Sequence, residues 1–216
     1  MRALILDFDG TLVDSEPLHG KALRSVLQPL GVPFDERACV GLPDADVLRS
    51  AFAAARRALP AALLNELMQR KSAAAHALWL DGLGLAYPGA VELVHEAKQA
   101  GMRVAVCTAA MRREAEPVLR TLGVLGVLDA FTTADDVAES KPHPACYRLT
   151  CERLGFAPPQ CVAVEDSVAG VAAAVGAGCH TIAVGHTTAR ARLAAAAEFV
   201  ERIGVLRGGV LTRRGA

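Results

Sequence analysis

The chain has 216 residues, of which 52% are hydrophobic and 21% are charged, and its 23 basic side chains balance its 23 acidic ones. This composition is typical of a globular protein and excludes an intrinsically disordered one. Because the charges balance, no global positive field draws the chain to nucleic acid or to an anionic membrane, and we expect neither as a partner.

Short apolar or β-branched segments alternate with helical patterns along most of the chain. This alternation predicts an α/β fold with a parallel sheet covered on both faces. The helix before the second strand is bounded by Pro88 ahead of its start and by Gly101 after its end. The predicted strands are Ala3–Leu6, Arg103–Cys107, Ala130–Thr133, Cys161–Val164 and Thr181–Val184.

One interval is too long for a simple crossover. Nearly a hundred residues separate the first two predicted strands, whereas one crossover helix needs about a dozen. The interval has helical composition, with predicted helices at Leu18–Leu30, Asp44–Leu59 and Ala61–Leu80. We therefore expect a helical domain at residues 15–87, inserted into a core made of residues 1–14 and 88–216. Residues 207–216 are expected to form a frayed tail.

Other features bear on the compartment. The N-terminal segment reaches an acidic residue at Asp7 and lacks the apolar region of a signal peptide, and the longest apolar stretch is too short to span a bilayer. The six cysteines form no C-x-x-C pair and no zinc-ligand spacing with histidine. These features predict a cytoplasmic protein with reduced thiols. We expect a monomer or a small homo-oligomer.

An acidic turn, Asp7-Phe8-Asp9-Gly10-Thr11, follows the first predicted strand directly. In an open parallel sheet, ligands bind outside the carboxyl ends of the strands. Two carboxylates this close repel each other unless a cation or a shared proton stabilises them, and Mg²⁺ is the hard cation that such oxygen ligands favour. The simpler alternative is a solvated acidic turn, because Asp and Gly are also common turn residues.

Three further signals favour a site over a simple turn. Thr108 ends the second predicted strand, Lys141 precedes a proline just ahead of a helix, and Glu165-Asp166 ends another apolar strand. Each has an ordinary explanation alone, as a cap, an exposed lysine or an acidic turn. Each also falls at a strand end or a helix start, so the fold can bring all of them together.

With these four motifs the sequence resembles the haloacid dehalogenase superfamily, in its branch of beta-phosphoglucomutase-like and phosphoglycolate phosphatase-like enzymes. The resemblance covers almost the whole chain. It implies a Rossmann-like, doubly wound parallel core with an inserted all-helical cap domain. It also implies a phosphatase that uses Mg²⁺ to hydrolyse a small phosphorylated metabolite, such as a sugar phosphate or phosphoglycolate.

The resemblance also implies roles for individual residues. Asp7 corresponds to the nucleophile that forms an aspartyl-phosphate, and Asp9 to the general acid/base. Thr108 and Lys141 correspond to the groups that hold the transferring phosphoryl oxygens. The implied metal ligands are Asp7, Asp9 through its main-chain carbonyl, Asp166, and Glu165 either directly or through water.

Substrate contacts are implied for His19 and Lys71 in the cap, although His19 could instead face solvent and Arg70 could replace Lys71. Ala109 stands where many relatives have a serine, so phosphate binding there falls to main-chain N–H groups or to arginines that include Arg112.

Two further departures concern the lysine and the cap. Ala145 replaces an acidic residue that often follows the lysine motif, which leaves the anchoring of Lys141 open. Residues 41–44 lack the cap arginine of the glucose mutases.

Three other functions remain as alternatives. A phosphomutase or phosphotransferase would pass the group to a sugar hydroxyl, which His19 and Lys71 favour and the missing cap arginine opposes. A 2-haloacid dehalogenase would share the fold but would not need Asp9. A catalytically silent binding module would share the fold without the chemistry, although every catalytic position is filled.

Overall fold

The structure is a computed structural model that describes residues 1–35, 44–80 and 86–212. It divides into two compact units: Met1–Asp14 with Ala86–Ala216, and Ser15–Leu85. The chain therefore leaves the first unit directly after Asp14 and re-enters it at Ala86, two residues before the boundary expected from the sequence.

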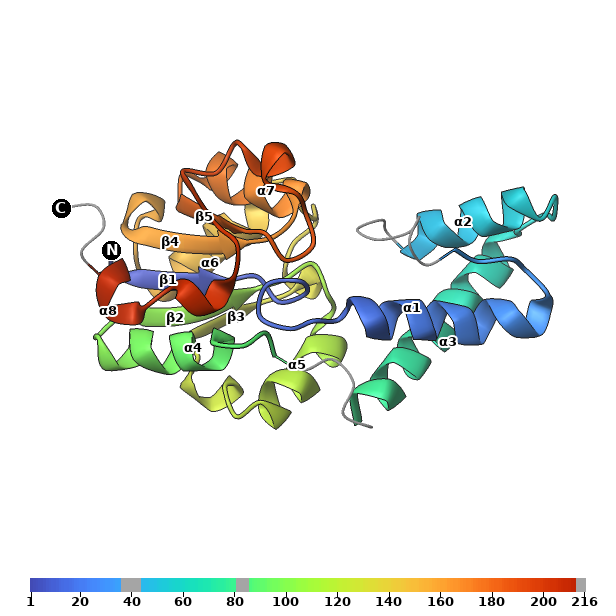
Figure 1. Cartoon of the computed structure of the whole chain (residues 1–216), viewed down its shortest axis with the longest axis horizontal. Helices are drawn as coiled ribbons and strands as arrows, with labels where there is room; N and C mark the ends of the chain where they lie inside the picture. The colour runs from blue at the N-terminus through green and yellow to red at the C-terminus, as the bar shows by residue number, and fades with distance from the viewer. Residues whose placement is uncertain (36–43, 81–85, 213–216) are drawn as a thin grey trace. The chain divides into compact units, whose positions relative to one another are not determined.

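The first unit is built on a six-stranded sheet in the order β3-β2-β1-β4-β5-β6 (Figure 1). Every strand pairs parallel to its neighbours. The chain winds outward from β1 in one direction and then from β4 in the other, so the order reverses between these two strands. Ligands bind at such a switch point in open α/β sheets. The strands are β1 (Ala3–Leu6), β2 (Arg103–Cys107), β3 (Ala130–Thr132), β4 (Cys161–Glu165), β5 (His180–Val184) and β6 (Glu198–Val200).

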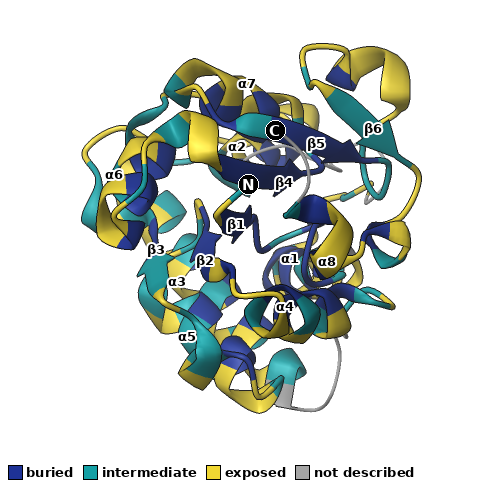
Figure 2. Ribbon diagram, turned by 90° about the vertical axis from the view of Figure 1, so that its left-hand side faces the viewer, coloured by how far each residue is buried: buried dark blue, intermediate teal, exposed yellow. Residues whose placement is uncertain are grey.

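Helices cover both faces of this sheet. They are α4 (Ala90–Gln99), α5 (Arg112–Thr121), α6 (Ala145–Leu154), α7 (Val168–Ala177) and α8 (Gly208–Leu211). Figure 2 shows α6 and α7 on one side of the sheet and α4 and α8 on the other, with the buried strands between them. Burial on both faces explains why the strands read as continuous apolar runs. The core under α6 and α7 includes Ala3, Ile5, Ala105, Cys107, Tyr147, Cys151, Ala163 and Ala173.

The parallel α/β fold predicted from the sequence is confirmed. The bounds of β1 and β2 are those predicted, and the other three predicted strands differ by one residue at one end. The sequence analysis missed β6, whose three residues are only half-buried. Of the six cysteines, the five in the described residues are free and buried, and Cys39 lies outside the described residues.

The expectation of a frayed C-terminal tail is wrong for residues 207–212. Leu211 in α8 is fully buried, and the main-chain N–H of Gly208 donates to Glu96 Oε2 at 3.1 Å. A Cβ atom on Gly208 would lie 2.4 Å from the main-chain nitrogen of Ala97, so only glycine allows α8 to approach α4 this closely. The last four residues lie outside the described ranges.

The second unit contains α1 (Glu16–Leu27), α2 (Asp44–Ala54) and α3 (Ala61–Leu80). α1 ends before the predicted Leu30 because Pro29 lacks an N–H, and a 3-10 turn follows at Gln28–Leu30. α2 ends five residues before the predicted Leu59. None of the described helices is both long enough and apolar enough to cross a membrane. The unit has its own core, which includes Leu23, Leu27, Val47, Leu48, Phe52 and Leu67.

A matched pair of substitutions tests the position of the core. Val162 in β4 is fully buried, whereas Val205 has 62% of its surface exposed. We expect Val162→Ala to lower the free energy of unfolding by about 2 kcal/mol, because it removes two buried methyl groups from a packed sheet. Val205→Ala should change it by less than about 0.5 kcal/mol. Urea unfolding followed by circular dichroism measures both, and equal effects would contradict this core.

Candidate active site

The acidic loop, residues 7–14, leaves the carboxyl end of β1 through a tight turn. The main-chain N–H of Asp7 still donates to Val164 O at 3.0 Å, so Asp7 is held in register with β4. Beyond it, Gly10 has φ +79°, a conformation that side-chain-bearing residues rarely adopt. The N–H of Gly10 donates to Val13 O at 2.8 Å, which closes the turn. The loop therefore presents its carboxylates at the end of the sheet.

Three carboxylates meet at the switch point between β1 and β4. One oxygen atom from each of Asp7, Glu165 and Asp166 lies within 4.8 Å of the others, and all three residues are buried. Among the described residues, this is the one group of such side chains that could hold a metal ion, and the Asp9 carboxylate is not part of it. Oxygen ligands in this arrangement suit a hard divalent cation.

Lys141 is the cation that the chain itself supplies to this group. Its Nζ donates to Asp7 Oδ1 at 2.5 Å, to Glu165 Oε1 at 2.6 Å and to the main-chain carbonyl of Cys107 at 3.0 Å. Only 6% of the lysine side chain is exposed. One ammonium group thus links the carboxyl ends of β1, β2 and β4, and it cannot be removed without leaving buried carboxylates unpaired.

Glu165 is held on every side by the protein. The buried hydroxyl of Tyr147 donates to Glu165 Oε1 at 2.7 Å, and Ser167 Oγ donates to Oε2 at 3.3 Å. A Cβ atom on Gly170 would lie about 2 Å from this carboxylate, so the first turn of α7 has no room for a side chain at this position. Glu165 therefore anchors Lys141. It contacts the lysine although Ala145 stands where relatives often have an acidic residue.

The sequence analysis missed Tyr147. The sequence offered one signal for it. Tyr147 stands at a buried position of its helix, and a buried tyrosine hydroxyl needs a hydrogen-bond partner.

Asp166 is oriented by two threonines. Thr11 Oγ1 donates to Asp166 Oδ1 at 3.0 Å, and Thr187 Oγ1 donates to Oδ2. A Cβ atom on Gly10 would lie 2.2 Å from Oδ2, so the glycine in the acidic loop also makes room for this carboxylate. Asp166 is 3% exposed.

The electrostatics of the group show that its negative charge is under-compensated. Burial, followed by the charge of Glu165, raises the pKa of Asp7 well above its usual range and that of Asp166 to about 7. Burial lowers the pKa of Lys141, but the charges of Asp7 and Glu165 outweigh it and raise that pKa well above 10.5. The lysine stays charged, and the carboxylates need a further cation or a proton.

The structure places Thr108 at the end of β2, buried beside the carbonyl that accepts from Lys141. Its N–H donates to Thr132 O at 2.9 Å, and its Oγ1 accepts from the N–H of Ala110 at 2.9 Å. Ala109 is exposed in the turn between them. The turn thus carries a fixed hydroxyl and an accessible small residue.

Arg112 is engaged elsewhere in the first unit. Its guanidinium donates to Phe131 O at 3.1 Å and to Asp136 Oδ2 at 3.3 Å, and it stacks 4.6 Å from the ring centroid of Phe131. These contacts tie α5 to the segment around β3. Since 42% of the Arg112 side chain is still exposed, its predicted contact with phosphate stays a prediction.

In the second unit, His19 and Lys71 lie together. Lys71 is 4% exposed, forms an ion pair with Asp44 Oδ2 at 2.6 Å and donates to His19 Nδ1. Its neighbour Arg70 keeps 49% of its side chain exposed and lies 3.6 Å from Glu66. Of the two adjacent cations, Lys71 is therefore the fixed one. The sequence analysis gave Asp44 no part in this group.

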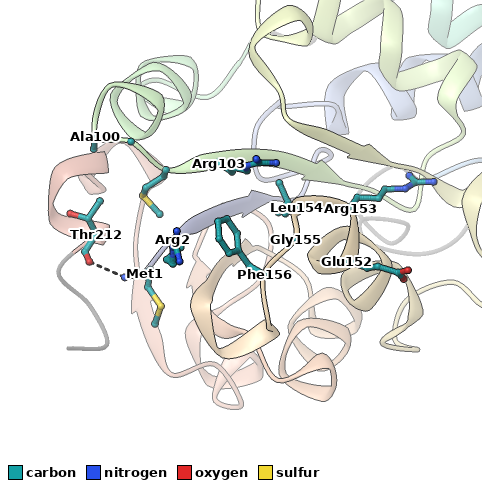
Figure 3. A pocket seen from close by; sticks show the side chains of 12 residues that line it. Met1, Arg2, Ala100, Arg103, Glu152, Arg153, Leu154, Gly155, Phe156 and Thr212 are labelled. Atoms are coloured by element: carbon teal, nitrogen blue, oxygen red, sulfur yellow. Dashed lines mark hydrogen bonds between the residues drawn. The ribbon is translucent and has the colours of Figure 1, made fainter.

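A cavity of about 640 Å³ lies at the amino end of the sheet, the end opposite the acidic group (Figure 3). It is lined by residues that precede or begin β1 and β2, such as Arg2 and Arg103, and by the end of α6. Arg2 stacks on Phe156 there, 4.7 Å from the ring centroid. None of the residues predicted for the site is among its lining residues.

The chain is similar to several known proteins. The haloacid dehalogenase-like hydrolase family matches residues 1–178. The chain is 34% identical over 190 residues to validoxylamine A 7'-phosphate phosphatase of Streptomyces hygroscopicus subsp. limoneus, covering 87% of this chain and 86% of that protein. It is 34% identical over 182 residues to fructose-1-phosphate phosphatase YqaB of Escherichia coli K12, covering 84% and 95%. CbbY from Rhodobacter sphaeroides, as a variant in complex with xylulose-(1,5)bisphosphate, has a TM-score of 0.80 at 30% identity, covering 94% and 95%.

The raised pKa values predict how stability depends on pH when no divalent cation is present. Between the unfolded value of about 3.8 and the folded value of about 7, the folded state binds the Asp166 proton more tightly than the unfolded state does. The free energy of unfolding should therefore fall as pH rises from 5 to 7, by at most about 1.4 kcal/mol per pH unit for one group.

Asp166→Asn should make this fall smaller, because it removes one of the two carboxyl groups with raised pKa values and weakens the repulsion on the other, Asp7. Urea titrations in EDTA at pH 5 and pH 7 give the difference between wild type and variant. The same slope in both proteins would contradict the assignment.

Proposed function

The chain belongs to the haloacid dehalogenase-like hydrolase family, and we propose that it is a Mg²⁺-dependent phosphatase of a small phosphorylated sugar. The observation that carries this proposal is the buried group of Asp7, Glu165 and Asp166 with Lys141, at the switch point of the sheet. A phosphatase needs both positive charge for phosphoryl oxygens and an anionic nucleophile, and this group offers both.

A divalent cation fits the charge of this group. Three carboxylates against one ammonium leave two negative charges uncompensated, and burial, followed by the charge of Glu165, raises the pKa values of Asp7 and Asp166. We propose that Asp7, Asp166 and the main-chain carbonyl of Asp9 hold Mg²⁺, with Glu165 acting through Lys141 or through water. When bound, the ion would neutralise charge on the phosphoryl group.

The nucleophile in this proposal is the Asp7 carboxylate. Its position is fixed from two sides, by the ladder bond to Val164 O and by Lys141 Nζ. Lys141 and Thr108 would hold phosphoryl oxygens, with main-chain N–H groups near Ala109. The P–O bond to the leaving group breaks as the bond to Asp7 forms, which gives an aspartyl-phosphate.

Asp9 would act as the general acid and then as the general base. An alkoxide is a poor leaving group, so Asp9 would protonate it during the first displacement. The ionised Asp9 would then take a proton from the water that hydrolyses the aspartyl-phosphate. Its carboxylate lies outside the group formed by Asp7, Glu165 and Asp166, so the proposed proton transfer would be separate from the proposed side-chain metal ligands.

The sugar class of the substrate rests on the relatives. Two of them are named as phosphatases of validoxylamine A 7'-phosphate and of fructose 1-phosphate. Their names favour hydrolysis over transfer to a sugar hydroxyl, so we do not propose a mutase. The balanced charge of the chain also fits a small cytoplasmic metabolite better than a polyanion.

Substitutions of the two loop carboxylates test this mechanism. We expect Asp7→Asn to lower kcat by about 10³-fold or more, because it removes the nucleophile. Asp9→Asn should lower kcat by about 10²- to 10⁴-fold, because it removes the proton donor. Phosphate release from a panel of sugar phosphates with MgCl₂ measures both, and EDTA should abolish turnover until Mg²⁺ is restored in excess.

Asp46→Asn is the matched control, since Asp46 keeps 57% of its side chain exposed on α2. It should leave kcat unchanged. Full turnover in EDTA, or activity of Asp7→Asn equal to that of wild type, would refute the mechanism. Conversion of a sugar 1-phosphate to an isomer without phosphate release would support the mutase instead.

We also propose that His19 and Lys71 contact the substrate. The ion pair with Asp44 holds the Lys71 ammonium in place within its unit, which lowers the entropy lost when it binds an anion. We expect Lys71→Met to raise KM about 10-fold with a smaller effect on kcat, because a charge-assisted contact contributes about 1.5–3 kcal/mol.

Arg70→Met is the matched control on the same helix and should leave KM unchanged. A KM that responds to Arg70→Met and not to Lys71→Met would reverse the assignment. Steady-state kinetics on the best substrate of the panel decides between them.

A further inference from the structure

His186 follows β5 and joins two segments far apart in the chain. The main-chain N–H of Ile203 donates to its Nε2 at 3.1 Å, so Nε2 carries no proton. The other ring nitrogen, Nδ1, must then carry the proton, and it donates to Gly10 O at 2.9 Å. Burial lowers the pKa of His186, which keeps the ring in this neutral form. The imidazole therefore ties the acidic loop to the turn at Ile203–Val205.

The same ring packs on the return segment, residues 86–89, where the chain re-enters the first unit. The rings of Tyr87 and His186 stack with centroids 3.8 Å apart. The N–H of Tyr87 donates to Leu12 O at 3.0 Å, and its hydroxyl donates to Asp14 Oδ1 at 3.4 Å. Loop, return segment and imidazole thus form a closed set of contacts.

Two glycines complete this set. A Cβ atom on Gly89 would lie 2.5 Å from Gly204 Cα, and a Cβ atom on Gly204 would lie 2.6 Å from Pro88 O. The return segment and the Ile203–Val205 turn are therefore in main-chain contact beside His186. Such close approach leaves little freedom for either segment to shift alone.

We propose that His186 is a positioning residue that fixes the acidic loop, and with it Asp9, against the return segment. The proposal rests on the proposed phosphatase function. Asp7 has its own anchors in Val164 and Lys141, whereas Asp9 is followed directly by Gly10, whose carbonyl is held by His186. Loss of His186 should therefore disturb the proton donor more than the nucleophile.

The dependence on leaving group tests this distinction. kcat/KM reports the steps through phosphoryl transfer, in which a sugar alkoxide needs a proton and 4-nitrophenolate does not. His186→Leu removes both hydrogen bonds and the aromatic stack. We expect it to lower kcat/KM about 10- to 100-fold for a sugar phosphate and less than about 3-fold for 4-nitrophenyl phosphate. His186→Asn, whose amide N–H can still donate to Gly10, should recover part of the loss.

Equal losses on the two substrates, or no loss, would overturn the proposal, because a merely structural role lowers both alike. His180→Asn is the control. His180 begins the same strand, β5, and its Nε2 lies 2.8 Å from Glu198 Oε1. It should leave both values unchanged. If His186→Leu does not fold, His186→Asn carries the measurement, with a smaller loss and the same selectivity.

Hydrogen–deuterium exchange tests the same role without turnover. The amides of residues 8–14 should exchange about 10-fold faster in His186→Leu and at the wild-type rate in His180→Asn. Unchanged exchange in the loop would overturn the proposal. Faster exchange together with a wild type that hydrolyses no phosphate ester would support the role of His186 and contradict the proposed phosphatase function.

Discussion

The buried contact between Lys141 and the carboxylates of Asp7 and Glu165 is the interaction on which the site depends. It joins the ends of β1, β2 and β4, with 6% of the lysine side chain exposed and Glu165 fully buried. Buried ion pairs seldom add much stability, because desolvation offsets their attraction. This one instead sets the charge of the site. It neutralises one of three carboxylates and leaves a deficit of two positive charges, the charge of a divalent cation.

Close packing around glycines makes this charge arrangement possible. Gly10 and Gly170 each stand where a Cβ atom would occupy the space of a carboxylate, that of Asp166 in one case and that of Glu165 in the other. The carboxylates therefore sit directly against main chain. Ser167 adds to this by capping α7 and donating to Glu165 with the same hydroxyl group. The positive end of the α7 dipole also favours an anion at this point.

The sequence predicted the parts of this structure that depend on pattern. β1 and β2 were found with their correct bounds because both are continuous apolar runs, and the topology then brings strand-end residues to one edge. The pattern of apolar residues does not predict which side chains contact each other. That Tyr147 supports Glu165, and that Arg112 is bound to Asp136, depends on contacts between residues about 20 positions apart. β6 was missed because a short, half-buried edge strand has no distinct periodicity.

The second unit is inserted directly after the acidic loop. The chain leaves the first unit after Asp14, at the end of the loop that carries Asp7 and Asp9, and re-enters at Ala86, which bridges to Val13 in that loop. The segment that holds the proposed acid/base is therefore joined directly to one end of the inserted unit and is bridged to the residue that follows its other end. A loop in that position needs anchors of its own within the sheet domain. The contacts of Gly10 with Asp166 and with His186 supply them from two different strand ends, β4 and β5. These contacts hold the acidic loop, and with it the proposed acid/base Asp9, within the first unit.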